Sequence, residues 1–192
     1  MEYKPLQVPA SAGFTGSHVE GGVCVAAGFK AGAVHAGFQP DPDRLDLAMV
    51  VADEPAAVAG VFTTNVFCAA PVTVDREHIA QSGYARAFVA NTKYANAATG
   101  EPGLAVARKT ADYVAAELGC APSDVLVAST GVIGAELDFA PFEDGVPAAR
   151  AALAHSAEAA HNAACAVMTT DTVPKEASFE GRVAAADGSE YT

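Results

Sequence analysis

A helix-to-strand unit at residues 100–128 constrains the fold of this chain more than any other feature. Gly119 is a natural helix end, and Pro122 lies just beyond it. The apolar run at residues 125–128 is typical of a buried strand. Strands interspersed with helices in this way predict a layered α/β fold. The apolar residues that recur on one face of the expected helix are Leu104, Ala107, Ala111, Val114 and Leu118.

Further strands and helices are expected on both sides of this unit. The glycine-rich stretch 13–37 predicts short strands joined by tight turns, one strand being 23–27. One helix is expected with Pro147 in its first turn, continuing to residue 153, and another from Ser156 as N-cap to Ala164. A strand or turn at 167–168 follows, and the tail predicts a hairpin that turns at 187–188. The remaining expected elements are strands at 45–52, 57–62, 71–74 and 87–90 and a loop at 39–43.

Composition narrows the classes of function. Hydrophobic residues make up 51% of the 192 residues and charged residues 18%, which favours a packed globular protein. Because no repeat or linker divides the sequence, we expect one domain over residues 1–192. The net charge of −12 argues against a nucleic acid or an anionic membrane as partner. The low charge and high alanine content fit either an interface with another chain or an alanine-rich proteome.

The N-terminus and the cysteines predict location and redox state. No charged-then-apolar leader and no membrane-length apolar run is found, so we expect a cytoplasmic protein. The histidines form no ligand spacing with the cysteines, so no metal site is expected, and His161 is expected to be a helix-surface or packing residue. In a reducing compartment four widely spaced cysteines are expected to be buried, free and inert: Cys24, Cys68, Cys120 and Cys165.

The strongest candidate for chemistry is the turn Ser-Thr-Gly-Val-Ile-Gly at 129–134, directly after the apolar run. Glycines let backbone N–H groups approach a ligand without a Cβ in the way. A hydroxyl beside such an amide makes a pair of donors for a developing oxyanion. An ordinary strand-to-loop turn explains the same residues. Three more loops, at 62–72, 91–100 and 168–175, are rich in small hydroxyl or amide side chains suited to a small polar ligand.

Together these segments resemble one known family. The chain is similar to the α chain of ornithine acetyltransferase, the bifunctional glutamate N-acetyltransferase or ArgJ family, over nearly its whole length. Each motif alone is weak, but their order and spacing are specific. The motifs are Gly-Phe-Lys-Ala-Gly (28–32), Asp-Leu-Ala (46–48), Ala-Gly-Val-Phe-Thr-Thr-Asn (59–65), Ala-Ala-Pro-Val (69–72), Ala-Asn-Ala (95–97), Thr-Gly (99–100), the 129–134 turn and Met-Thr-Thr-Asp-Thr (168–172).

The resemblance implies a layered α/β sandwich of mixed sheets flanked by helices, the DmpA/ArgJ-like fold. It implies a precursor that cuts itself before a threonine, which becomes the N-terminal nucleophile of a β chain in an α2β2 assembly. That threonine moves an acetyl group from N-acetylornithine to glutamate in arginine biosynthesis, releasing ornithine, and acetyl-CoA is a second donor in bifunctional members. No cofactor is implied. An N-terminal threonine suits this chemistry because its own α-amine can activate the hydroxyl.

Three residues inherit roles from the resemblance. Thr130 and Gly131 fall on the family's oxyanion-hole pair, and Thr169 falls on a substrate-contacting threonine. Thr170 and Thr172 either join that contact or brace the turn, as hydroxyl residues often do.

Two departures from the family pattern stand out. Residues 91–93 read Asn-Thr-Lys where the family usually has Asn-Ser-Gly. Loss of that glycine is expected to alter a tight turn, and Lys93 either faces the site or is solvated. The family's Lys-Gly-Ser-Gly-Met segment and its cleavage point are expected beyond Thr192, so the nucleophile and one substrate-binding lysine would lie outside this chain.

We therefore predict the α chain of a self-processed acetyltransferase, which supplies the oxyanion hole and part of the substrate pocket and is inactive without its β chain. One alternative is the α chain of a related self-cleaving aminopeptidase or amidase, and another is a non-catalytic binding subunit. The Thr-Thr-Asp-Thr run together with the 129–134 turn favours the transferase.

Overall fold

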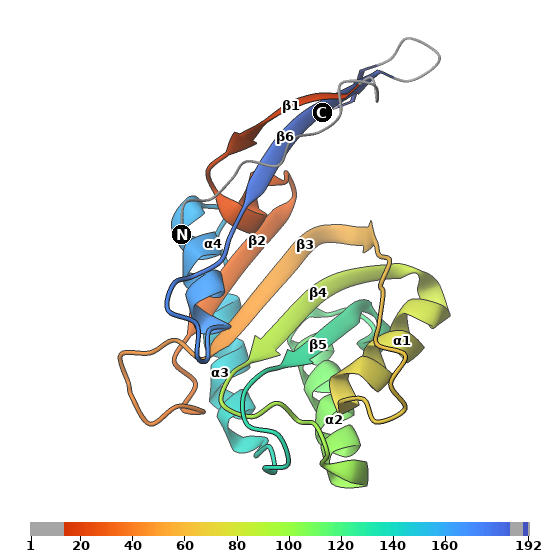
Figure 1. The fold of residues 1–192 in the computed structure, drawn as a ribbon, viewed down its shortest axis with the longest axis vertical. Coiled ribbons are helices and arrows are strands. Elements are labelled where there is room, and N and C mark those ends of the chain that lie inside the picture. The colour runs from red at the N-terminus through yellow and green to blue at the C-terminus, as the bar shows by residue number, and fades with distance from the viewer. Residues whose placement is uncertain (1–13, 185–189, 192) are drawn as a thin grey trace.

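A four-stranded mixed sheet forms the body of the molecule (Figure 1). The computed structural model describes residues 14–184 and 190–191. The sheet order is β2 (Phe29–Val34), β3 (Leu47–Ala57), β4 (Tyr84–Asn91) and β5 (Val125–Ser129). β2, β3 and β4 pair antiparallel, whereas β4 and β5 are parallel. Helix α2 (Gly100–Leu118) lies between β4 and β5 in the chain, because parallel neighbours need a long crossover.

Helices pack on both faces of this sheet. Leu47, Met49 and Val51 alternate along β3 and pack into the main core with α1 (Ala70–Ser82), α2 and α3 (Ala140–Ala151). Ala48 and Val50 point the opposite way, toward α4 (Ala157–Ala166). The prediction of a layered α/β fold with mixed sheets is confirmed.

A second sheet forms an arm that reaches away from the body (Figure 1). It contains β1 (Phe14–Val19), β6 (Ser178–Ala184) and β7 (Glu190–Tyr191), in the order β1-β6-β7 and all antiparallel. The pairing of β6 with β7 fits the predicted hairpin in the tail. Its predicted turn at 187–188 lies outside the described residues.

The predictions that rested on helix caps are confirmed. α2 ends where expected, because Gly119 takes a left-handed φ of 67° and its N–H donates to the Ala115 carbonyl. The Ser156 hydroxyl accepts from the Ala159 N–H (3.1 Å) and so caps α4. Two short 3-10 helices, η2 (Gly22–Val25) and η3 (Pro122–Asp124), complete the helical elements of residues 14–184.

Two predicted strands are wrong because a helix occupies their place. Residues 71–74 begin α1, where Pro71 lies in the first turn and its missing N–H costs nothing. Residues 22–25 form η2 instead of a strand at 23–27.

Two further corrections concern prolines. β3 continues through the exposed residues 53–55, and no strand follows at 58–62. The register of β3 with β4 shifts between Val51 and Ala56, so Pro55 needs no backbone hydrogen bond to β4. Pro147 lies inside α3 and not in its first turn. The buried side chains of Phe142 and Val146 hold that helix against the core, so packing outweighs the proline.

Of the helices in the described part of the chain, none combines the length and apolarity that a bilayer span requires. The single domain and the cytoplasmic location stay predictions of the sequence.

Candidate functional site

Two turns at one edge of the sheet are joined backbone to backbone, because β4 and β5 are parallel and end side by side. The Thr130 N–H donates to the Asn91 carbonyl (3.0 Å) and the Val132 N–H to the Lys93 carbonyl (2.9 Å). The Ala95 N–H returns a bond to the Val132 carbonyl (3.0 Å). We call residues 91–95 and 129–134 the paired turns.

The close approach of the paired turns depends on Gly131. Its φ is 137°, a conformation that side chains rarely adopt. A Cβ on Gly131 would lie 2.3 Å from the backbone C and O atoms of Lys93 and 2.8 Å from the Tyr94 N. Any residue except glycine would therefore push the two turns apart.

The arrangement leaves two donors free. The Thr130 N–H is already used, but within the described residues neither its hydroxyl nor the Gly131 N–H has a hydrogen-bond partner. Thr130 is half-buried and Gly131 is exposed. A hydroxyl and an amide on adjacent residues, fixed by a backbone ladder, have the composition of an oxyanion hole.

Buried side chains hold the paired turns in place. Asn91 is 1% exposed, and its Oδ1 accepts from the Ser129 hydroxyl (2.7 Å) while its Nδ2 donates to the carbonyls of Thr92 (3.1 Å) and Tyr94 (3.3 Å). Buried amides satisfied in this way rigidify the segments that they connect. The loop conformation is therefore set before any ligand arrives.

Asn96 holds the loop at 62–72 in place in a similar way. Its Nδ2 donates to the Gly103 carbonyl (2.9 Å) and its Oδ1 accepts from the Thr99 hydroxyl (2.8 Å), which fixes the start of α2. Its backbone carbonyl accepts from the Ala70 N–H (3.1 Å) at the start of α1. A cavity of about 250 Å³ lies between these loops and includes Phe67 in its lining. Three of the four predicted loops are thus brought together.

Left-handed backbone at residues other than glycine gathers in the same region. The φ angles are 79° at Lys93, 46° at Asn96 and 59° at Ala98. Such conformations cost free energy and are often retained at functional sites. Lys93 is half-buried, and its ammonium has no ion-pair partner among the described residues.

Asp46 supports the site, and the sequence reasoning gave it no role. It is fully buried, and its carboxylate accepts from the N–H groups of Ala36 (2.6 Å) and Gln39 (2.7 Å). Its carbonyl accepts from the Thr92 N–H (2.9 Å) and so ties the paired turns to the segment before β3. The available signal was an acidic residue directly before an apolar strand, because a buried carboxylate needs several donors.

Thr169 lies in the loop after α4, which is linked to the paired turns through the segment at 44–46. The Met168 carbonyl accepts from Arg44 Nη2 (3.2 Å), two residues before Asp46. Thr169 is half-buried, and its hydroxyl has no partner in the described part of the chain. Among the same residues no hydrogen bond joins Thr169 directly to Thr130.

Asp171, more than the neighbouring threonines, braces this loop. Its carboxylate pairs with the Lys175 ammonium and accepts from the Thr169 N–H (3.4 Å). The hydrogen bond from Lys175, followed by that from the Thr169 N–H, lowers the pKa of Asp171. Thr170 and Thr172 are exposed and their side chains make no hydrogen bond to the described residues.

The cysteines differ in part from the prediction. All four are free, and Cys24 is buried as expected. The expectation of burial is wrong for Cys68, Cys120 and Cys165, which are half-buried. No group of three or more His, Cys, Asp and Glu residues within the described ranges is arranged to hold a metal ion.

Comparison with known proteins identifies similar sequences. The model of the ArgJ family matches residues 30–190. The chain is 44% identical over 165 residues to the chloroplastic arginine biosynthesis bifunctional protein ArgJ of Ostreococcus lucimarinus, covering 86% of this chain and 36% of that protein. It is 46% identical over 157 residues to ArgJ of Nitratidesulfovibrio vulgaris, covering 82% of this chain and 39% of that protein. The chain thus spans about two fifths of the length of the curated relatives it matches.

Solved structures show the same fold. The crystal structure of arginine biosynthesis bifunctional protein ArgJ from Bacillus halodurans matches with a TM-score of 0.84 at 33% identity, covering 92% of this chain and 90% of that chain. The crystal structure of ornithine acetyltransferase from Mycobacterium tuberculosis, complexed with ornithine, matches with a TM-score of 0.79 at 35% identity and covers 92% of both chains.

Proposed function

Because this chain belongs to the ArgJ family, we propose that it supplies the oxyanion hole and part of the substrate pocket of an acetyltransferase of arginine biosynthesis. The reaction moves an acetyl group from N-acetylornithine to glutamate. The observation that carries the proposal is the pair of free donors on the paired turns, the Thr130 hydroxyl and the Gly131 N–H. The reaction needs no cofactor, and acetyl-CoA would enter only as a second donor.

In this proposal the nucleophile is the N-terminal threonine of a partner β chain. Its hydroxyl attacks the acetyl carbonyl, whose oxygen becomes negatively charged. Thr130 and Gly131 donate to that oxygen and stabilise the transition state, and one such donor contributes roughly 10²–10³ in rate. The same two donors act again when glutamate takes the acetyl group, because the second step passes through the same kind of intermediate.

Thr169 is proposed to bind the amino-acid end of ornithine or glutamate. Its half-buried hydroxyl has no partner in the described residues, and Arg44 holds the preceding carbonyl in place. An unused hydroxyl at a fixed position is available for a substrate, whereas a hydroxyl that braced the turn would already have a partner.

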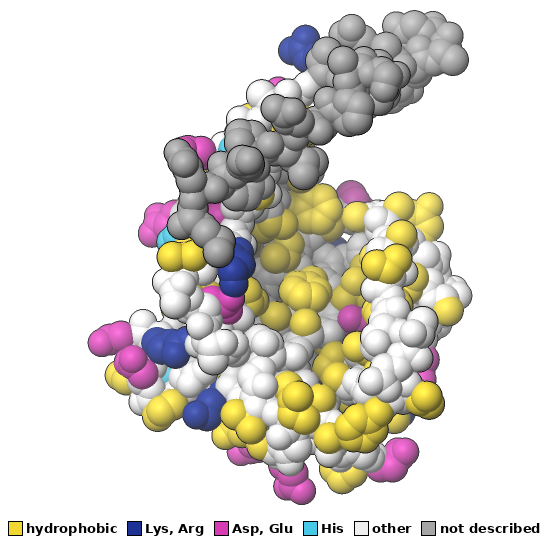
Figure 2. Space-filling model, in the orientation of Figure 1, with side chains coloured by type: hydrophobic (Ala, Val, Ile, Leu, Met, Phe, Trp, Pro, Cys, Tyr) yellow, Lys and Arg dark blue, Asp and Glu magenta, His cyan; other side chains and the backbone are white. Residues whose placement is uncertain are grey.

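The bare part of the sheet is proposed to bind the β chain, in an α2β2 assembly. On the face opposite α1–α3, α4 covers β2 and part of β3 but not β4, so Phe88 of β4 remains 38% exposed beside Val50 and Leu126. Figure 2 shows hydrophobic side chains gathered in the hollow over the sheet. Apolar patches of this kind mark protein interfaces.

The test is an assay of the chain produced together with its β-chain partner. We expect acetyl transfer from N-acetylornithine to glutamate, followed by mass spectrometry of both amino acids. Formation of acetate without N-acetylglutamate would instead indicate a hydrolase and would overturn the proposal. A partner that fails to co-purify with the chain would overturn the proposed interface.

A further inference from the structure

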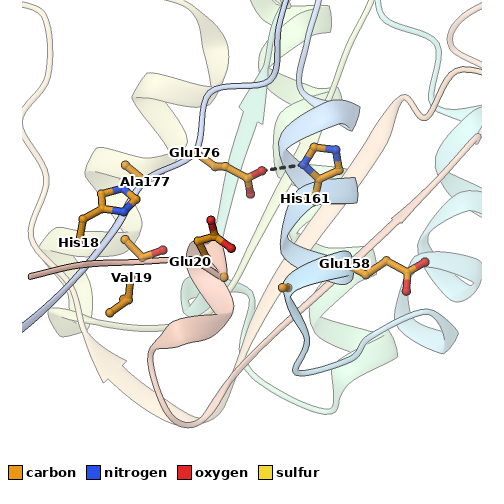
Figure 3. Close-up of a pocket in the computed structure, with 11 residues that line it drawn as sticks. His18, Val19, Glu20, Glu158, His161, Glu176 and Ala177 are labelled. Atoms are coloured by element: carbon orange, nitrogen blue, oxygen red, sulfur yellow. Dashed lines mark hydrogen bonds and ion pairs between the residues drawn. The ribbon is translucent and has the colours of Figure 1, made fainter. Parts of the chain in front are cut away.

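A second cluster of chemically active side chains lies on α4 and the loop that follows it. Cys165 Sγ is 3.6 Å from His161 Nε2, one helical turn away. His161 Nδ1 is 2.6 Å from Glu176 Oε1 (Figure 3). The three groups thus lie in the order thiol, imidazole, carboxylate.

The Glu176 carboxylate determines which nitrogen of the His161 ring carries the proton. An ionised Glu176 can only accept hydrogen bonds, so His161 Nδ1 must carry a proton. In the neutral ring Nε2 then has the lone pair, and it faces the Cys165 thiol. This is the arrangement in which an imidazole withdraws a proton from a nucleophile while an acid holds the ring in place.

The cluster is open to solvent. The His161 side chain is 51% exposed and that of Glu176 is 32% exposed, and Cys165 is half-buried. A cavity of about 500 Å³ adjoins the imidazole, and Glu20 and Glu158 line it together with Glu176 (Figure 3). Cys165 does not line this cavity, so a small reagent reaches its sulfur through the exposed part of that half-buried side chain. The carboxylates around the imidazole favour cationic reagents over anionic ones.

We propose that Cys165, His161 and Glu176 form a reactive-thiol site that exchanges with small disulfides carrying amino groups. His161 Nε2 takes the thiol proton, and the Cys165 sulfur attacks one sulfur of the disulfide RS–SR. A new S–S bond forms to Cys165, the original S–S bond breaks, and the leaving thiolate takes the proton from the imidazolium to give RSH. The site is distinct from the proposed oxyanion hole, since none of its residues lies in the paired turns.

The other cysteines provide internal references. Burial raises the pKa of the Cys120 thiol, with a further contribution from Asp124, so Cys120 should react slowly. Cys68 is half-buried like Cys165, but its thiol lies beside the Thr73 hydroxyl and not beside an imidazole. Cys24 is 5% exposed and reports whether the fold is intact.

The experiment labels the assembled protein with cystamine and measures each cysteine by peptide mass spectrometry between pH 6 and 9. At pH 7 we expect Cys165 to react about tenfold faster than Cys68, and His161→Asn to remove that advantage. Glu176→Gln should lower the Cys165 rate less, and 3,3′-dithiodipropionate should react more slowly than cystamine at Cys165 relative to Cys68.

Three results would overturn the proposal. They are a Cys165 rate no higher than that of Cys68, a rate unchanged by His161→Asn, and no labelling of Cys165 in the assembled protein. Labelling of Cys24 in His161→Asn would show that this variant is misfolded, and His161→Gln is then used in its place. A Cys165 rate that is unchanged in His161→Gln likewise contradicts proton transfer to His161.

Discussion

Gly131→Ala should destabilise the protein through the contact between the paired turns. An alanine at a φ of 137° costs at least about 1 kcal/mol relative to glycine. Its Cβ would also lie 2.3 Å from the Lys93 backbone, so the turns must separate. The bonds between Val132 and Lys93 and between Ala95 and Val132 would then be lost, at about 0.5–1.5 kcal/mol each. The expected total is about 2–4 kcal/mol.

Gly134→Ala is the matched control, because Gly134 lies in the same turn. Its φ is 81°, but nothing lies within 4 Å of a Cβ placed there. Only the conformational cost applies, so the expected loss is about 1 kcal/mol. Thermal unfolding of both variants in the assembled protein should show a fall in Tm at least twice as large for Gly131→Ala. Equal shifts would refute the argument, because the close approach would then contribute nothing.

Three further predictions concern single side chains. Lys93→Gly should raise the free energy of unfolding by up to about 1 kcal/mol, because glycine adopts the φ of 79° without strain, whereas Lys93→Ala keeps the strain and should give no gain in a thermal melt. Burial raises the pKa of Asp75 to about 6 against the lowering effects of the Val127 N–H bond and His78, so the folded state binds the proton more tightly than the unfolded state. The free energy of unfolding should therefore fall as the pH rises from 3.8 to about 6. Asp75→Asn, which can still accept from the Val127 N–H, should flatten that part of the pH dependence, and an unchanged slope would contradict the role of Asp75. Thr169→Val should raise the KM for ornithine-type substrates with little change in Tm, since a hydrogen bond between neutral groups contributes roughly 0.5–1.5 kcal/mol and one to a charged group contributes more. A lower Tm with unchanged KM would make Thr169 a structural residue.

The sequence predicted those helices and strands whose ends depend on caps and apolar runs within the element itself. α2 and β5 follow from an apolar stripe, a glycine cap and an apolar run, all within 30 residues of each other. The helix start at 70–74 was missed because Val72, Thr73 and Val74 favour strands, while only tertiary contact shows that they pack as a helix. The interior position of Pro147 likewise depends on packing that no local pattern displays.

The candidate site likewise has one part that local sequence indicates and another that depends on contacts between distant segments. Thr130 and Gly131 were singled out by a turn that glycine and hydroxyl residues define locally. The contacts of Asp46 with Thr92 and of Asn91 with Ser129 join residues 46 and 38 positions apart, so no local pattern indicates them. The contact between His161 and Cys165 was not predicted, because the expected helix ended at Ala164 and α4 in fact continues to Ala166. The further contact with Glu176 depends on the path of the following loop.

The most direct test of the account is the rate of acetyl transfer by Thr130→Ala in the assembled enzyme. We predict that kcat falls roughly 10²–10³-fold, because one oxyanion donor is lost, while Tm is almost unchanged. Ser123→Ala is the control, since Ser123 lies in η3 at the opposite end of β5 from Thr130 and the loss of its hydroxyl should leave the rate unaffected. Self-cleavage is followed by gel so that only processed enzyme is compared. A kcat near that of the unmodified enzyme in fully processed Thr130→Ala would contradict the assignment of the oxyanion hole.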